Sequence, residues 1–210
     1  MQWVKTINKQ IVFAVLLFSI LFFVSRLPKL GFEAINPDAV NWHYRSEQFV
    51  VGLKNQIWEK TYQHYHPGVT LMWITGIPIE IFKQLSGVEI YDQFSFYSFH
   101  LIAKHSLVLV QLILSVMIIF WLSKILEFKK ALLTMAIFSF EPFIIGNSRL
   151  YHMDIIFTLF VFGAIVLSNL YIKEENNMWA LLAGVFCSLS FLTRSIGVGL
   201  LLFVLGFGGL

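Results

Sequence analysis

Long runs of apolar residues without a single charge constrain this chain more than any other feature. The first run, IVFAVLLFSILFFV, covers residues 11–24, and similar runs recur up to the end of the 210-residue sequence. Only 13% of the residues are charged, whereas a soluble domain carries roughly 25%. So few charges cannot cover a surface in water. The composition therefore predicts an all-α polytopic membrane protein.

The apolar runs predict about six transmembrane helices. They lie at residues 11–24, 106–122, 131–146, 155–172 and 178–192, with a last run that begins at Ile196. The run at residues 69–82 contains Gly76, Pro78 and Glu80. It is shorter than the roughly 20 residues that a full span requires. We therefore expect it to be an interfacial or re-entrant helix.

Lysines at the ends of the runs predict the orientation of the chain. The first run follows Lys5 and Lys9, and later turns carry Lys124, Lys129, Lys130 and Lys173. The positive-inside rule places all three groups in the cytoplasm if residues 69–82 do not cross the membrane. We therefore expect a single membrane domain over residues 1–210, in which residues 28–103 form a long extracytoplasmic loop with interfacial helices. Because the sequence stops inside an uncharged run, we expect it to be the N-terminal part of a longer protein.

Most polar residues that could do chemistry fall on the predicted extracytoplasmic face. They are Asp38, His43, Arg45, Glu47, His64, His66, Arg149, His152, Asp154 and Arg194. The small excess of 15 Lys and Arg over 12 Asp and Glu indicates topology signals and not a nucleic-acid surface. Acids and cations that converge above a helical bundle would form a site.

Asp38 lies early in the polar loop, in the segment INPDAVNWHYRSEQ. An aspartate after a proline often caps a helix. A carboxylate directed at an acceptor hydroxyl can also serve as a general base. The residues alone leave both roles open.

The segment HYHP offers His64 and His66 just before an apolar run. With His43 and Asp38 these histidines could bind a metal. They could also contact a substrate phosphate, or make structural hydrogen bonds at the membrane interface. A divalent metal is the least expected of the three.

Four charged residues lie at or inside the later spans. Arg149 and Asp154 belong to NSRLYHMD, and Arg194 belongs to LTRS. Each could anchor the chain at the interface, or bind an anion or a polar partner there. Glu141 lies within a span beside Pro142, which can kink the helix, and it needs a partner that the sequence does not identify.

The order of these motifs resembles the GT-C glycosyltransferases. The resemblance rests on a first span, a long loop with an early aspartate, HP before an interfacial helix, and SR with an aspartate five residues after the arginine. It is closest to the protein O-mannosyltransferases, the lipid A aminoarabinose transferases and the RgtA/B/C/D-like enzymes. It covers residues 11 to about 203.

This resemblance implies an activity. Such enzymes move a sugar, here a mannose-like or other hexose or pentose, from a polyprenyl-phosphate donor to an extracytoplasmic acceptor, with inversion. The acceptor is a protein, a lipid or a polysaccharide. The resemblance further implies membrane lipids as partners and no cofactor beyond the lipid-linked donor. The charge balance predicts no nucleic-acid partner, and because the chain looks prokaryotic we expect it in the plasma membrane.

The resemblance also implies roles for single residues. Asp38 matches the loop aspartate that acts as general base. Arg149 is the first candidate for binding the donor phosphate, followed by Arg194 and His66. The other candidates for the substrate site are His43, Glu47, His64 and Asp154. The chain departs from the family pattern because Ala39 follows Asp38 where a second acid is common, and because HPG replaces HPP.

Three other interpretations remain. The first is a multi-span transporter or flippase for a lipid-linked or polar substrate, although transporters place polar groups near the middle of the membrane. A metal-dependent membrane enzyme would use His43, His64 and His66. A fragment could also have a structural role only. The collection of polar residues on one face favours an interfacial enzyme.

Overall fold

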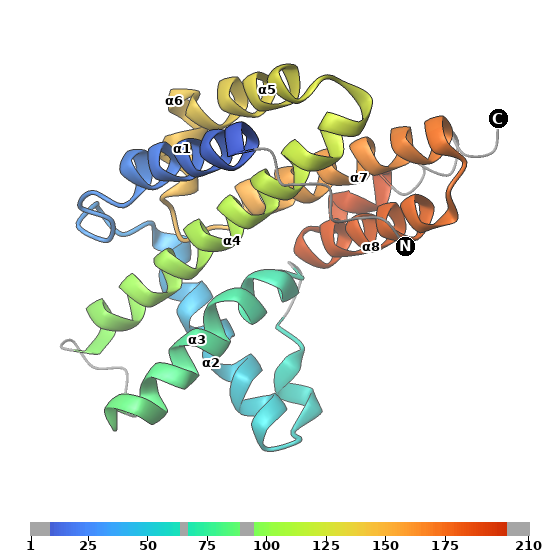
Figure 1. The fold of residues 1–210 in the computed structure, drawn as a ribbon. Coiled ribbons are helices and arrows are strands. Elements are labelled where there is room, and N and C mark those ends of the chain that lie inside the picture. Colours follow the sequence, from blue (N-terminus) through green and yellow to red (C-terminus); the bar gives the residue numbers. More distant parts are fainter. Residues whose placement is uncertain (1–8, 64–66, 89–94, 201–210) are drawn as a thin grey trace.

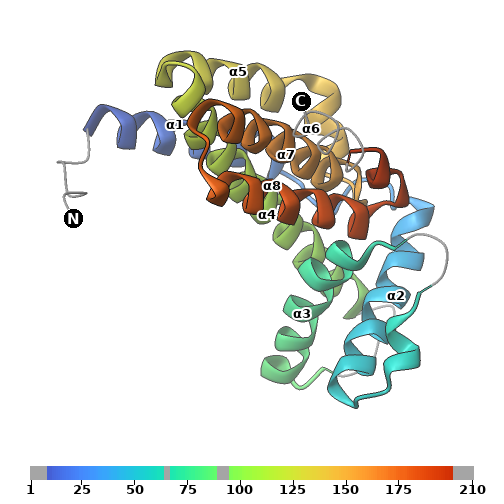
Figure 2. The ribbon, with the colours of Figure 1, turned by 90° about the vertical axis from the view of Figure 1, so that its right-hand side faces the viewer.

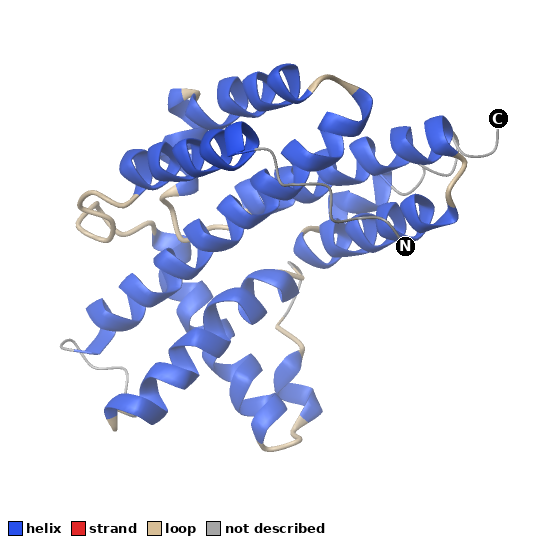
Figure 3. Ribbon diagram, viewed as in Figure 1, coloured by secondary structure: helices blue, strands red, loops and turns tan. Residues whose placement is uncertain are grey.

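The computed structural model describes residues 9–63, 67–88 and 95–200, and every regular element in these ranges is a helix (Figure 1; Figure 3). In chain order they are α1 (Lys9–Arg26), α2 (Pro37–Lys54), η1 (Trp58–Thr61), α3 (Val69–Ser86), α4 (Ser95–Ile125), α5 (Phe128–Phe140), α6 (Pro142–Ser148), α7 (Asp154–Glu174), α8 (Asn177–Thr193) and η2 (Ser195–Gly197). The prediction of an all-α protein is confirmed.

Fewer helices could cross a membrane than the six that the sequence predicts. Within the described residues, α1, α4 and α7 are long and apolar enough, and α5 with α6 would make a fourth span if the bent pair counts as one. The apolar helix α8 is shorter, with 17 residues. Most of the run that begins at Ile196 lies outside the described residues. The chain is an integral membrane protein of several helices, and the described residues do not confirm six spans.

The central helix α4 begins earlier than its apolar run predicts. It starts at Ser95 instead of residue 106 and contacts α1, α3, α5, α6 and α7 (Figure 1). Residues 95–103, which the sequence analysis assigns to the loop, are its first turns. The polar residues His100 and Lys104 interrupt the apolar run, so hydropathy alone does not reveal that the helix begins before them. Both side chains are buried in the fold.

The single run at residues 131–146 is two helices joined at a bend of 67°. Pro142 takes the first position of α6, where its missing N–H costs nothing. The carboxylate of Glu141 accepts a hydrogen bond of 2.8 Å from the backbone N–H of Ile144. The partner that Glu141 requires is therefore the exposed first turn of α6.

Helices α2 and α3 pack together beside the N-terminal half of α4 (Figure 1). Two ion pairs join them, Glu47 with Lys83 at 2.7 Å and Lys54 with Glu80 at 2.8 Å. Gly76 permits the close packing, because a Cβ there would lie 2.7 Å from a methyl group of Val50. Helix α2 of this pair supplies one wall of the site described below.

The cap of α2 is Asn36, so of the two roles left open for Asp38, that of helix cap is not the one observed. The Asn36 Oδ1 atom accepts a hydrogen bond of 3.1 Å from the backbone N–H of Asp38. Pro37 occupies the first helical position, which moves the cap one residue ahead of it. The Asp38 side chain is left available for another role.

The ends of the helices separate into two groups. The α4–α5 and α7–α8 turns lie at the same end of the bundle (Figure 2), where the Lys173 Nζ atom donates to the carbonyl of Lys124 at 2.7 Å. The start of α7 and the end of α8 lie at the opposite end, close to α2 and α3 (Figure 2). These two turns carry Lys124, Lys129, Lys130 and Lys173, and we call them the lysine-rich turns. They are thus separated from the polar face.

Candidate functional site

Three helix ends converge around a pocket of about 200 Å³. They are the N-terminus of α2, the N-terminus of α7 and the C-terminus of α8. The described residues that line the pocket are Asp38, Asn41, Trp42, Arg45, His152, Met153 and Arg194.

One face of α2 supplies four of these residues. Asp38, Asn41, Trp42 and Arg45 are three or four positions apart, so they lie on the same side of the helix. The Asp38 side chain is 59% exposed and lies in the first turn, where the helix dipole favours an anion. The guanidinium carbon of Arg45 lies 4.9 Å from the centre of the Trp42 ring. This cation–π contact holds Arg45 at the pocket wall.

The segment between α6 and α7 is anchored by the buried side chain of Tyr151. Its hydroxyl donates to Thr75 Oγ1 at 2.8 Å and lies 3.1 Å from Ser46 Oγ. Burial raises the pKa of Tyr151 to about 12, so the phenol stays neutral. Because Tyr151 is fixed against α2 and α3, the next two residues, His152 and Met153, line the pocket.

Ion pairs connect both sides of the pocket. His152 Nδ1 lies 3.1 Å from Asp154 Oδ2, and His152 Nε2 lies 3.6 Å from Asp38 Oδ2. The other oxygen of Asp154 forms an ion pair with Arg194. The structure thus brings together three residues that the sequence analysis singled out: Asp38, Asp154 and Arg194.

Gly68, the glycine of HPG, packs against residues at the pocket wall. Its backbone N–H donates to the carbonyl of Thr193 at 3.2 Å, next to Arg194. Its φ is +52°, and a Cβ at this position would lie 2.3 Å from the Trp42 ring. Glycine in place of the second proline of HPP therefore lets α3 begin directly against a wall of the pocket. His64 and His66, two further candidates, lie outside the described residues.

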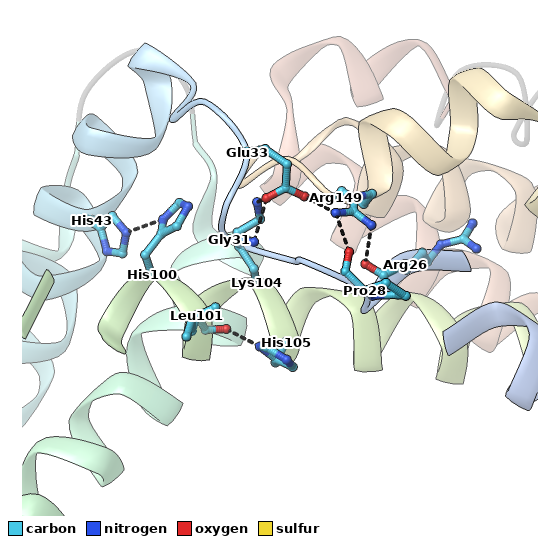
Figure 4. Close-up of polar contacts among 10 residues, drawn as sticks. All are labelled: Arg26, Pro28, Gly31, Glu33, His43, His100, Leu101, Lys104, His105 and Arg149. Atoms are coloured by element: carbon cyan, nitrogen blue, oxygen red, sulfur yellow. Dashed lines mark hydrogen bonds and ion pairs between the residues drawn. The ribbon is translucent and has the colours of Figure 1, made fainter. Parts of the chain in front are cut away.

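Arg149 does not line the pocket, because other groups occupy its guanidinium. Its Nε donates to Glu33 at 2.8 Å, and its two terminal nitrogens each donate at 2.9 Å to the carbonyls of Arg26 and Pro28 (Figure 4). These bonds attach the segment after α1 to the end of α6. This placement favours a structural clamp over the predicted phosphate contact.

Glu33 completes this clamp by binding a second cation. Lys104 Nζ donates to its other oxygen at 2.7 Å (Figure 4). Burial alone would raise the pKa of Glu33, but hydrogen bonds from Lys104, from the backbone and from Arg149 lower it to about 2. Glu33 is therefore ionised and bridges two helices of the bundle.

His43 and Glu47 also lie away from the pocket. His43 is buried, with its Nε2 3.0 Å from His100 Nδ1 (Figure 4). Burial, and then the charge of His100, lower the pKa of His43 to about 3, so it is neutral and offers no cation. Glu47 pairs with Lys83.

Across the described ranges, no group of three or more His, Cys, Asp or Glu side chains is arranged to hold a metal ion.

Sequence reasoning gave no role to several residues of the pocket. Asn41, Trp42 and Arg45 could have been found from their helical spacing after Asp38. The sequence analysis includes His152 among the polar residues, and its neighbour Asp154 is only two positions away. Its other carboxylate neighbour, Asp38, comes from α2, which no local pattern reveals.

The pocket can perform acid–base chemistry beside an anion. An exposed carboxylate, Asp38, faces the same space as the guanidinium groups of Arg45 and Arg194. Arginine binds phosphate oxygens in a bidentate manner. A hydroxyl and a phosphate ester could therefore meet here.

Comparison with known proteins identifies the family of the chain. The sequence model of the dolichyl-phosphate-mannose-protein mannosyltransferase family matches residues 98–207, more than half of the 210 residues. The match includes His152, Asp154 and Arg194 and begins after Asp38 and α2. No curated protein and no solved structure matches the chain. The chain belongs to the dolichyl-phosphate-mannose-protein mannosyltransferase family, and is thus a membrane glycosyltransferase of the GT-C type.

Proposed function

We propose that this protein transfers a sugar from a polyprenyl-phosphate donor to a hydroxyl group of an extracytoplasmic acceptor, with inversion at the anomeric carbon. One observation carries the proposal. The Asp38 carboxylate opens onto the same pocket as Arg45 and Arg194. A base and cations within one small pocket are what the attack of a hydroxyl on a sugar phosphate requires.

Asp38 acts as the general base in this proposal. It orients the acceptor hydroxyl and removes its proton as the oxygen attacks the anomeric carbon. With 59% of the side chain exposed, an acceptor can reach it. Its position in the first turn of α2 fixes it on a rigid element.

Arg194 and Arg45 bind the phosphate that leaves with the lipid. Arg194 gives one terminal nitrogen to Asp154 and has further N–H donors for phosphate oxygens. Arg45 is held by Trp42 on the opposite wall. Negative charge grows on the phosphate as the sugar–oxygen bond breaks, so these cations stabilise the transition state more than the ground state. Arg149 and Glu33 support the fold around them.

The location of the pocket suits a lipid-linked donor. The pocket lies at one end of α7, which is long and apolar enough to span a membrane, and of the shorter apolar helix α8, so the polyprenyl tail can stay in lipid while its phosphate reaches the interface. The lysine-rich turns lie at the opposite end, which supports an extracytoplasmic pocket by the positive-inside rule. A prokaryotic plasma membrane is the proposed location. The acceptor is a protein, a lipid or a polysaccharide.

The test is to follow the sugar. Membranes that contain the full-length protein would receive a panel of polyprenyl phosphates, each with one radiolabelled hexose or pentose, and the label would be followed into lipid-free and new lipid products. We expect one donor to lose its label to an acceptor, without added metal. Movement of labelled lipid across vesicles without transfer would instead establish the flippase interpretation.

A further inference from the structure

The pocket contains a histidine that the transfer reaction as proposed does not use. His152 lies between the carboxylates of Asp38 and Asp154, with 19% of its side chain exposed. It comes from the segment that Tyr151 anchors, so its position is fixed by a buried neighbour. Histidine is the side chain that most often accepts and releases protons near neutral pH, and two carboxylates beside it favour its protonated form.

The distances limit where the proton on this imidazole can lie. A carboxylate only accepts hydrogen bonds, so a hydrogen bond from the ring to Asp154 requires a proton on His152 Nδ1, which lies 3.1 Å from Asp154 Oδ2. In that tautomer of the neutral ring the lone pair is on Nε2, which faces Asp38 Oδ2 at 3.6 Å. That distance is longer than a hydrogen bond, so the ring and the Asp38 carboxylate must approach each other before a proton passes between them.

The geometry points to His152 as the group that receives from Asp38 the proton lost by the acceptor hydroxyl, an inference that rests on the proposed transfer reaction. The acceptor O–H bond breaks and its proton passes to Asp38. The oxygen forms a bond to the anomeric carbon, and the carbon–oxygen bond to the phosphate breaks with its electron pair on the phosphate oxygen. The proton then moves from Asp38 Oδ2 to His152 Nε2, and water removes it after the products leave.

The surrounding charges stabilise the imidazolium that this step creates. Asp38 and Asp154 each place one carboxylate oxygen against it. The described cations of the pocket are Arg45, which lies over Trp42, and Arg194, which pairs with the far oxygen of Asp154. Asp154, with Oδ2 at 3.1 Å from Nδ1, is placed to orient the ring, which is the part that an aspartate plays in a catalytic triad, although Asp154 itself is 43% exposed. His152 is a positioning and proton-accepting residue that acts through Asp38.

The test compares pH profiles of sugar transfer for wild type, His152→Gln and His105→Gln in membranes. Only a neutral imidazole can accept the proton, so wild-type kcat should rise with pH on a limb that His152 governs. We expect His152→Gln to lose that limb and leave only the carboxylate limb at lower pH, with kcat reduced on the order of 100-fold. KM for the lipid donor should change little. His105 is an exposed histidine that contacts a backbone carbonyl of its own helix, so His105→Gln should match wild type.

A chemical rescue makes the test independent of the exact fold of one variant. Added imidazole should restore much of the activity of His152→Ala, because a free base can enter the space left by the ring, and should do nothing for Asp38→Asn. If wild type transfers sugar and His152→Gln keeps both its rate and the full acid limb, the proton route is overturned and the transferase remains. If wild type transfers no sugar from any donor, the proposed function itself fails, and the proton route with it.

Discussion

At the scale of single residues, Glu33 contributes more to the stability of the fold than its place in a polar loop indicates. It binds Lys104, whose side chain is 4% exposed, and Arg149, whose side chain is 19% exposed. Loss of this carboxylate would leave a buried ammonium group without its counter-ion. Such a loss is far more costly than breaking a surface ion pair.

Glu33→Gln is therefore expected to destabilise the protein at neutral pH. The cost should be on the order of 3 kcal/mol, the lower end for breaking a buried ion pair, because Glu33 is 29% exposed. The pKa of Glu33 falls from 4.5 to about 2 on folding, so its contribution is complete above about pH 4.5 and is lost as the pH falls towards 2. Thermal unfolding in detergent should show a gap between wild type and variant that narrows over this range. A gap that stays constant down to pH 2.5 would contradict this assignment.

The sequence could not separate the roles of Arg149 and Arg194. Both follow an apolar run and both suit an anion. Arg149 binds Glu33 across 116 positions of sequence, whereas Arg194 binds Asp154 across 40. Contacts this distant depend on how the helices pack, and one sequence without its fold does not contain them in readable form. Asp38 could be singled out from its motif alone, and the structure places it at the pocket.

At the scale of elements, α2 and α3 shape the pocket through one close contact. Trp42 of α2 packs over Gly68, which begins α3 with a left-handed φ. Any side chain at position 68 must push the indole ring out of place. Because Trp42 also lines the pocket and holds Arg45, this contact links packing to binding.

Gly68→Ala should therefore destabilise the protein by about 1–3 kcal/mol, the usual cost of overpacking, and raise KM for the lipid donor. Gly87→Ala is a matched control. Gly87 also has a left-handed φ, of +69°, but nothing lies within 4 Å of a Cβ there. It therefore has the same backbone strain without the clash. Thermal unfolding and donor titration of both variants would separate the two effects. Equal behaviour would mean that backbone strain alone matters at position 68.

Element positions were predictable where apolar runs had clear ends. The runs at residues 155–172 and 178–192 correspond to α7 and α8 within two residues at each end. The start of α4 was missed because buried polar residues such as His100 interrupt its run. The bend at Glu141 was foreseeable from Pro142, but the division into two helices depends on the carboxylate that caps α6.

At the scale of the whole molecule, the proposed function requires that the two ends of the helical bundle face opposite sides of the membrane. The α4–α5 and α7–α8 turns must face the cytoplasm, and the pocket must face the other side. The all-helical membrane class followed directly from the shortage of charge. The number of membrane crossings could not be predicted in the same way. Helix α3 has 18 residues and α8 has 17, close to the roughly 20 that a full span requires.

Site-directed labelling should show this division. Cys187 is buried and is the only cysteine in the sequence, so Cys187→Ser provides a background. On it, Phe32→Cys and Ile196→Cys should react with a membrane-impermeant thiol reagent in intact cells, since both positions are exposed near the pocket end. Glu127→Cys and Glu175→Cys, in the two lysine-rich turns, should react only after the cells are opened. Labelling of all four from outside would refute the proposed orientation.

The central claim is that the pocket beside α2 is where the sugar is transferred, and Asp38→Asn tests it most directly. The substitution keeps the size of the side chain and the Asn36 cap, which uses only the backbone of residue 38. Membranes with wild type, Asp38→Asn or Glu47→Gln would receive the labelled donor that wild type consumes. The account predicts at least a 100-fold loss of transfer for Asp38→Asn, with normal insertion, and near-normal transfer for Glu47→Gln, since Glu47 pairs with Lys83 away from the pocket. Equal transfer by wild type and Asp38→Asn would contradict it.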